Sequence, residues 1–218
     1  MQAQPAPGAG IKALADPFPQ SHIFGHDRST RPFRGAGPRR ARGIRLSPRS
    51  HHPGGGGGAR RRFHSLPFKP YEFRGYLAAR RIVAYGWRYG ADGKAIVEAN
   101  AIPDFLLQVR AKAAAFAGLE PDDLAQAMVT DYPPGAPIGW HRDRPAFGQV
   151  VGVSLLTPAP LRLRLERPGG GWDRVTQVLE PRSAYHLSGA ARSRWQHSIP
   201  PLDAQRYSIT FRTLARAP

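Results

Sequence analysis

Short runs in which apolar and polar residues alternate constrain the fold of this 218-residue chain more than any other feature. Leu161, Leu163 and Leu165 alternate with charged residues, and residues 206–212 repeat the pattern. Side chains of a β-strand point alternately to its two faces, so this spacing predicts strands with one apolar and one polar face. Further strands are expected at 128–132, 149–155, 175–179 and 183–187.

One segment carries the spacing of a helix instead. Apolar residues recur every three or four positions from Phe105 to Phe116, Pro103 suits the first turn, and Gly118 can end the helix. A second, shorter helix is expected from Pro121. Many short strands with a helical layer outside predict a mainly β fold, the double-stranded β-helix or jelly roll, backed by one or two helices.

The first 62 residues differ in composition from the rest. They hold 12 Lys and Arg against two Asp, are rich in Pro and Gly, and include the run Gly54–Gly58. Such a segment buries too little apolar surface to offset its conformational entropy. We therefore expect a disordered basic tail over 1–62 and one folded domain over 63–218. The tail either contacts nucleic acid nonspecifically or is a solvated linker, and both alternatives remain open.

Composition also excludes several classes of protein. The chain has no cysteine, so it has neither disulfides nor a thiolate zinc site, and this suits a reducing cytoplasm. No apolar run approaches the ~20 residues that cross a bilayer. We expect a cytoplasmic monomer without a membrane partner.

Three residues in the second half of the chain have the chemistry of an iron site. His141 and Asp143 lie two positions apart, so an extended segment would point both to one side, and His197 would arrive from another strand. Two imidazoles and one carboxylate hold one face of Fe(II) and leave the opposite positions open. The His-Glu-x-x-His motif of helical zinc sites is absent.

The strand expected at 206–212 has two possible interpretations. Tyr207, Ile209 and Phe211 form its apolar face. The polar face either meets water or lines a cavity in which two guanidinium groups hold a dicarboxylate. That polar face comprises Arg206, Ser208, Thr210 and Arg212.

Together with Asp131-Tyr132-Pro133-Pro134-Gly135, these motifs resemble the AlkB-like family of Fe(II)- and 2-oxoglutarate-dependent dioxygenases from about residue 66 to 214. The resemblance implies Fe(II), 2-oxoglutarate and O2, and oxidative dealkylation of bases in single-stranded or flipped nucleic acid, a repair-type reaction. It implies iron ligands at His141, Asp143 and His197. It also implies co-substrate contacts at Tyr132, Arg206, Ser208 and Arg212.

Three positions depart from the family pattern. Ser208 stands where the family usually has Asn, and Thr130 where some members have Asn; both keep a polar group. Pro145 replaces the acidic residue that often recognises the damaged base. Two alternatives therefore stay open: the same chemistry on a protein side chain or small molecule, or a nonenzymatic basic nucleic-acid-binding module.

Residues 66–100 interleave aromatic residues with arginines, as surfaces that bind single-stranded nucleic acid do. The resemblance makes this segment a lid that helps to hold nucleic acid. The alternative is a strand whose aromatic residues fill the core. Candidate substrate contacts in this segment and beside the metal pair are Arg74, Tyr76, Arg81, Trp87 and Trp140.

Overall fold

The computed structural model describes residues 43–47, 63–73, 76–90 and 95–215. Seven strands form a large sheet: β1 (Ile44–Ser47), β2 (Lys69–Phe73), β3 (Tyr76–Tyr85), β6 (Gln126–Tyr132), β8 (Phe147–Leu155), β11 (Ala184–Leu187) and β13 (Arg206–Leu214). Four form a small sheet: β7 (Ile138–His141), β9 (Ala159–Glu166), β10 (Trp172–Leu179) and β12 (Gln196–Ile199). A separate pair joins β4 (Trp87–Tyr89) to β5 (Ile96–Glu98).

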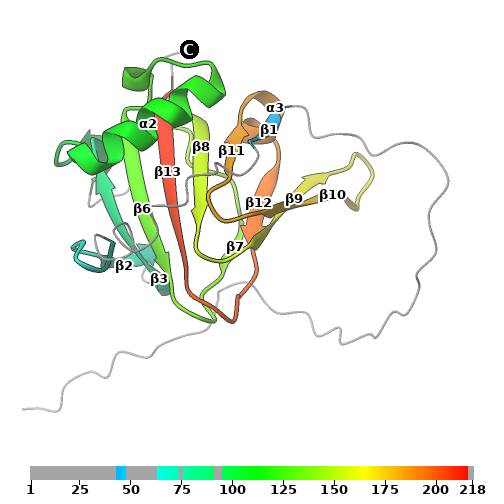
Figure 1. The fold of residues 1–218 in the computed structure, drawn as a ribbon. Helices are drawn as coiled ribbons and strands as arrows, with labels where there is room; N and C mark the ends of the chain where they lie inside the picture. Colours follow the sequence, from blue (N-terminus) through cyan, green and yellow to red (C-terminus); the bar gives the residue numbers. More distant parts are fainter. Residues whose placement is uncertain (1–42, 48–62, 74–75, 91–94, 216–218) are drawn as a thin grey trace, which may run out of the picture.

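The chain passes back and forth between the two main sheets (Figure 1). The large sheet has the order β1-β11-β8-β13-β6-β3-β2, and the small sheet has the order β10-β9-β12-β7. From β6 onward, the path runs large, small, large, small, small, large, small, large, and every neighbouring pair is antiparallel. This is the double-stranded β-helix that the strand spacing predicted, and the expected fold class is confirmed.

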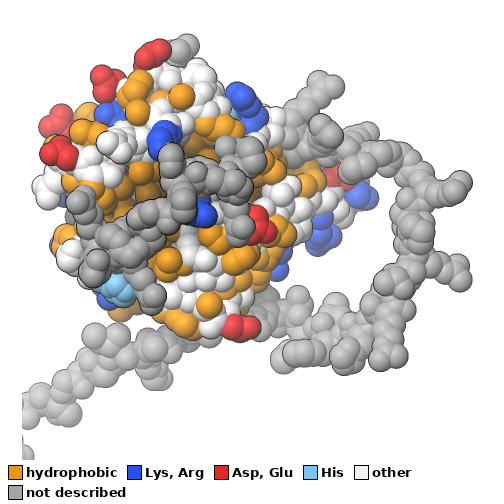
Figure 2. Space-filling model, in the orientation of Figure 1, with side chains coloured by type: hydrophobic (Ala, Val, Ile, Leu, Met, Phe, Trp, Pro, Cys, Tyr) orange, Lys and Arg blue, Asp and Glu red, His pale blue; other side chains and the backbone are white. Residues whose placement is uncertain are grey.

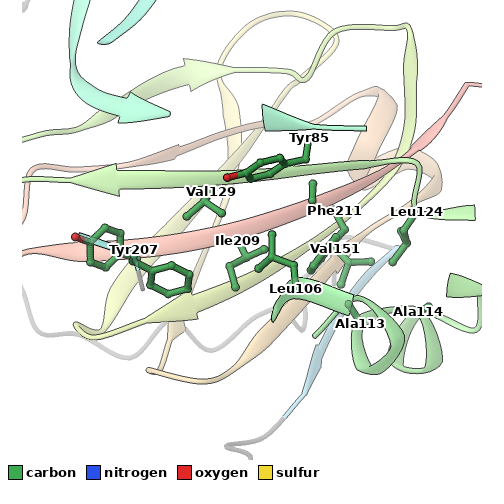
Figure 3. Close-up of a cluster of buried hydrophobic side chains, with 12 residues drawn as sticks. Tyr85, Leu106, Ala113, Ala114, Leu124, Val129, Val151, Tyr207, Ile209 and Phe211 are labelled. Atoms are coloured by element: carbon green, nitrogen blue, oxygen red, sulfur yellow. The ribbon is translucent and has the colours of Figure 1, made fainter. Parts of the chain in front are cut away.

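The expected helix is α2 (Asp104–Ala117), and it packs on the outer face of the large sheet (Figure 1). Pro103 precedes its first turn, and Gly118 ends it in the left-handed conformation, φ 72°. Leu106, Ala113 and Ala114 are buried against the sheet (Figure 3). The second expected helix is a single 3-10 turn, η1 (Pro121–Asp123).

Strand β13 has a different core on each face. Tyr207, Ile209 and Phe211 join the apolar cluster beneath α2 (Figure 3). The polar residues between them are also buried, so the interpretation of a polar face in water is wrong for this strand. In the small sheet, Leu161 and Leu163 point inward to a second cluster, which also contains Val150 of the large sheet. The polar residues of β13 therefore face the space between the two sheets.

The disorder expected for residues 1–62 is wrong at Ile44–Ser47, which form β1 beside β11. The edge of β11 offers unpaired backbone groups, and Ile44 packs against the cluster between the sheets. Composition could not reveal this, because the partner strand lies about 140 residues away. The remaining expected tail residues, 1–42 and 48–62, lie outside the described part. None of the described helices is long and apolar enough to cross a membrane.

Candidate metal and co-substrate site

His141, Asp143 and His197 come together at one end of the small sheet. His141 and His197 are directly opposite on β7 and β12, with ring centroids 4.2 Å apart. His141 Nε2 lies 3.6 Å from Asp143 Oδ1, and one ligand atom from each residue falls within 4.8 Å of the others. His141 Nδ1 lies 2.8 Å from the Gly139 carbonyl oxygen, to which it can donate, leaving Nε2 for a metal. The three side chains can hold one ion.

The electrostatics of this cluster favour the charge states that bind metal. Burial, with a neighbouring His141, lowers the pKa of His197 to about 3, so its imidazole is neutral at physiological pH. Burial alone would raise the pKa of Asp143, but Arg212, His141 and His197 hold it well below its usual value. A neutral imidazole at His197 and an ionised carboxylate at Asp143 are ligand forms that suit Fe(II) with open positions.

Arg212 acts on Asp143 directly. Its Nε donates to Asp143 Oδ2 at 2.9 Å, and its Nη1 donates to Gln126 Oε1 at 2.8 Å. Gln126 Nε2 in turn donates to the Trp87 carbonyl oxygen at 2.7 Å. Arg212, expected near the co-substrate, thus orients a candidate ligand and connects it to β4. Gln126 was not among the predicted residues, because a lone glutamine in a strand carries no chemical signature.

Arg192 forms hydrogen bonds to the backbone of the segment that follows Asp143. It lies in the short helix α3 (Gly189–Ser193), four residues before β12. Its Nε donates to the Gly148 carbonyl oxygen at 2.6 Å, and its Nη2 donates to the carbonyl oxygens of Arg144 and Phe147 at 2.8 and 2.6 Å. One guanidinium thereby ties the segment behind Asp143 to the segment that leads to His197. No sequence motif marks this residue.

Arg206 is the buried cation of a second group of side chains, which also comprises Thr130, Tyr132, Ser154 and Ser208. It is 1% exposed, its Nε donates to Ser154 Oγ at 3.1 Å, and its guanidinium lies 5.0 Å from the centroid of the Tyr132 ring. Arg206 Nη1 and Thr130 Oγ1 are buried without a hydrogen-bond partner among the described residues. Ser208 is directly opposite Thr130 on the neighbouring strand. Because unpaired buried donors are costly, this group fits an anionic oxygen acceptor.

Tyr185 interacts electrostatically with members of both groups and was not predicted. It belongs to β11, opposite Gly152 of β8, and a Cβ on Gly152 would overlap its ring. Burial raises the pKa of the Tyr185 hydroxyl to about 12, although Arg206 opposes the shift; Tyr132 and Asp143 also act on it. The missing side chain at Gly152 therefore makes room for a neutral tyrosine beside both groups.

The predicted substrate contacts are dispersed. Arg81 pairs with buried Asp131, its Nε lying 3.0 Å from Oδ2, and Trp87 reaches the site through its backbone carbonyl. Trp140 precedes His141 on β7 and faces the opposite side of the small sheet, against Arg162 and Arg164. Tyr76 begins β3, and its side chain lies outside the described part, as does the whole of Arg74.

The sequence pattern of the 2OG-Fe(II) oxygenase superfamily matches residues 77–212, more than half of the chain. The chain belongs to this superfamily. This chain is therefore a 2-oxoglutarate-dependent dioxygenase that uses Fe(II), 2-oxoglutarate and O2. The alternative of a nonenzymatic binding module is set aside. The matched range includes all three residues of the metal cluster and both arginines of β13.

Solved structures resemble the oxygenase in fold. OsALKBH1 matches with 15% sequence identity and a TM-score of 0.51, covering 67% of this chain and 83% of its own. A prolyl-4-hydroxylase from Pseudomonas putida has 17% identity and a TM-score of 0.47, covering 72% and 82%. Comparison with curated proteins gives no match.

Proposed function

We propose that His141, Asp143 and His197 hold Fe(II), and that Arg206 binds the distal carboxylate of 2-oxoglutarate with help from Tyr132. The observation that carries the second assignment is the unpaired Nη1 of Arg206, a buried charged donor with no partner among the described residues. A carboxylate would satisfy it through a charge-assisted hydrogen bond. Thr130 and Ser208 supply nearby hydroxyl groups, and Arg212 keeps Asp143 oriented and ionised.

Anaerobic titration of the protein with Fe(II) and 2-oxoglutarate tests these assignments. Bound together, they should give the visible charge-transfer band of an iron-chelated keto acid. His141→Ala should abolish the band, because a ligand is lost. Arg206→Gln should keep the band but raise the 2-oxoglutarate concentration required by about 10- to 100-fold, the worth of one charged hydrogen bond. Lys112→Gln on the exposed side of α2 is the matched control and should titrate like the wild type. A folded wild-type protein without a band would refute the assignment.

The substrate class we propose is nucleic acid carrying an alkylated base. The support is the AlkB-like spacing of His141, Asp143, His197 and the β13 arginines, together with the basic character of the chain. In the reaction, one oxygen atom of O2 enters succinate as 2-oxoglutarate loses CO2, and the other converts an N-alkyl C–H to C–OH. The hydroxylated alkyl group then leaves as an aldehyde, and the base nitrogen recovers its proton.

The same chemistry on a protein side chain or small molecule is the second candidate. Pro145 favours it, because this residue stands where an acidic base-recognising group is usual, and its side chain offers no hydrogen bond. Mass spectrometry of a methylated single-stranded oligonucleotide incubated with enzyme, Fe(II) and 2-oxoglutarate separates the two. Loss of one methylene unit, with aldehyde release, supports dealkylation. Succinate formation with an unchanged oligonucleotide favours the second candidate.

A further inference from the structure

The outer face of the small sheet concentrates arginines. Leu161 and Leu163 of β9 point inward, so Arg162 and Arg164 between and after them point outward. Arg174 of β10 is directly opposite Arg164 and shares its face. Figure 2 shows Lys and Arg side chains gathered along the β9–β10 hairpin. We call the set Trp140, Arg162, Arg164, Trp172 and Arg174 the outer arginine face.

One carboxylate, Glu166, acts electrostatically on Arg164 from the same face of β9, so the positive charges outnumber the negative ones on this face. Like charges that face each other directly across two strands destabilise a sheet, and Arg164 and Arg174 have this arrangement. Arg162 lies two residues from Arg164 along β9, a separation of about 6.6 Å along the strand. Arg162 Nε donates to Ser198 Oγ and Arg164 Nε to Gln196 Oε1, both neutral acceptors. Within the described residues, no ion pair involves these three guanidinium groups. Bound anions would relieve this repulsion.

Aromatic rings interleave with the charges. The Arg164 guanidinium lies 4.4 Å from the Trp140 ring centroid and 4.1 Å from that of Trp172. Trp172 also lines an open hollow of about 190 Å³, whose other lining residues include two further cations and one carboxylate. The hollow is lined by Arg142, Leu165, Glu166, Trp172, Arg194 and Gln196, with Ser193 beside them. A hollow of this size has room for a single flat ring, and the aromatic ring of Trp172 belongs to its lining.

We propose that the outer arginine face binds a single strand of nucleic acid, with phosphates against Arg162, Arg164 and Arg174 and a base stacked on Trp172 in the hollow. A row of cations beside stacking aromatic rings is the combination by which proteins hold single strands without reading their sequence. An acidic peptide would use the cations but would leave the aromatic hollow empty. The inference rests on the nucleic-acid substrate class proposed above, and it places a second contact surface on the opposite side of the sheet from the metal site.

Fluorescence anisotropy of a labelled, unmethylated oligothymidylate, measured on the full chain across a range of salt concentrations, tests the proposal. Arg164→Gln/Arg174→Gln should bind about tenfold more weakly at low salt. The slope of log K against log salt should become shallower by about 1.4, the value for two fewer neutralised phosphates. Lys112→Gln/Arg182→Gln removes the same charge from exposed positions elsewhere and should bind like the wild type.

Further variants separate charge, stacking and fold. Arg164→Lys/Arg174→Lys should keep the wild-type salt slope, since the charges remain. Trp172→Leu should weaken binding about fivefold or more without changing the slope. The charge-transfer band with Fe(II) and 2-oxoglutarate verifies that each variant is folded at the metal site.

Two results overturn the proposal. One is an equal loss of affinity in Arg164→Gln/Arg174→Gln and in the control Lys112→Gln/Arg182→Gln, or no loss of affinity in either double variant. The other is polyglutamate binding as tightly as oligothymidylate with the same dependence on Arg164 and Arg174, which would assign the face to an acidic protein. Failure of the proposed function would be seen separately. If the wild-type protein binds the oligonucleotide through this face but leaves its methylated form unchanged, the inference is supported and dealkylation is refuted.

Discussion

Buried ionisable residues make the proposed metal site sensitive to acid when no metal is bound. Burial is the largest cause, and electrostatic repulsion by His141 is the second; together they lower the pKa of His197 from its ordinary 6.5 to about 3. Burial also lowers the pKa of His186, on the outer side of β11 next to Arg45. In both cases the unfolded chain binds a proton at a pH where the native protein does not.

The pH dependence of stability follows from this difference. For His197 the stabilisation is fully present above about pH 6.5 and is lost as the pH falls toward 3, by up to about 1.4 kcal/mol per pH unit. Urea unfolding of metal-free protein at pH 7 and pH 5.5 should therefore show lower stability at pH 5.5. His197→Gln, which cannot titrate, should show a smaller difference, with the part due to His186 remaining. Identical differences in both proteins would contradict the assignment.

At the scale of elements, one side chain of α3, that of Arg192, joins this helix to the segment that follows Asp143. Arg192 donates to the carbonyl oxygen of Arg144, just after Asp143, and to those of Phe147 and Gly148 at the start of β8. Arg192→Gln should lower Fe(II) affinity about tenfold, as loss of groups that orient metal ligands commonly does. The concentration of Fe(II) needed for half of the charge-transfer band measures this change. Lys112→Gln is the control. A loss of stability with unchanged Fe(II) affinity would limit Arg192 to a structural role.

Helix α2 packs on the outer face of the large sheet and stabilises it. Leu106 is fully buried beneath it, whereas the adjacent Leu107 is 41% exposed. Leu106→Ala should reduce the free energy of unfolding by about 2–5 kcal/mol through lost burial and a cavity. Leu107→Ala should change it by about 0.5 kcal/mol or less. Chemical denaturation of the two variants gives the comparison, and equal effects would mean that α2 is packed differently.

At the scale of the whole molecule, the site joins both sheets. His141 and His197 belong to the small sheet, whereas Arg212, which holds Asp143, belongs to the large one. Ligands that bind only the native protein stabilise it, by about 2.7 kcal/mol at a concentration 100-fold above Kd. Anaerobic Fe(II) with 2-oxoglutarate should therefore raise Tm, and a chelator should reverse the rise. His141→Ala should fold but show no rise; a rise of wild-type size would place the metal elsewhere.

Much of the fold could be predicted from local spacing. The alternation in 161–166 and 206–212 became β9 and β13, and the helical spacing from Phe105 became α2. The same spacing could not distinguish a polar face in water from one lining a cavity, since both have period 2. It also missed β1, whose four residues gain stability from the open edge of β11 rather than from their own composition.

The sequence by itself determined the chemistry of this protein: two histidines, an aspartate and two arginines at the spacing of an iron- and 2-oxoglutarate-dependent oxygenase. Only the tertiary structure decided which partner each side chain has. Arg212 contacts Asp143, Arg206 keeps a buried nitrogen unpaired, and Trp140 faces away from the metal site. The physical reason is that side-chain identity and period 2 are local properties, whereas burial and pairing arise from strands far apart in the sequence that the two sheets bring together.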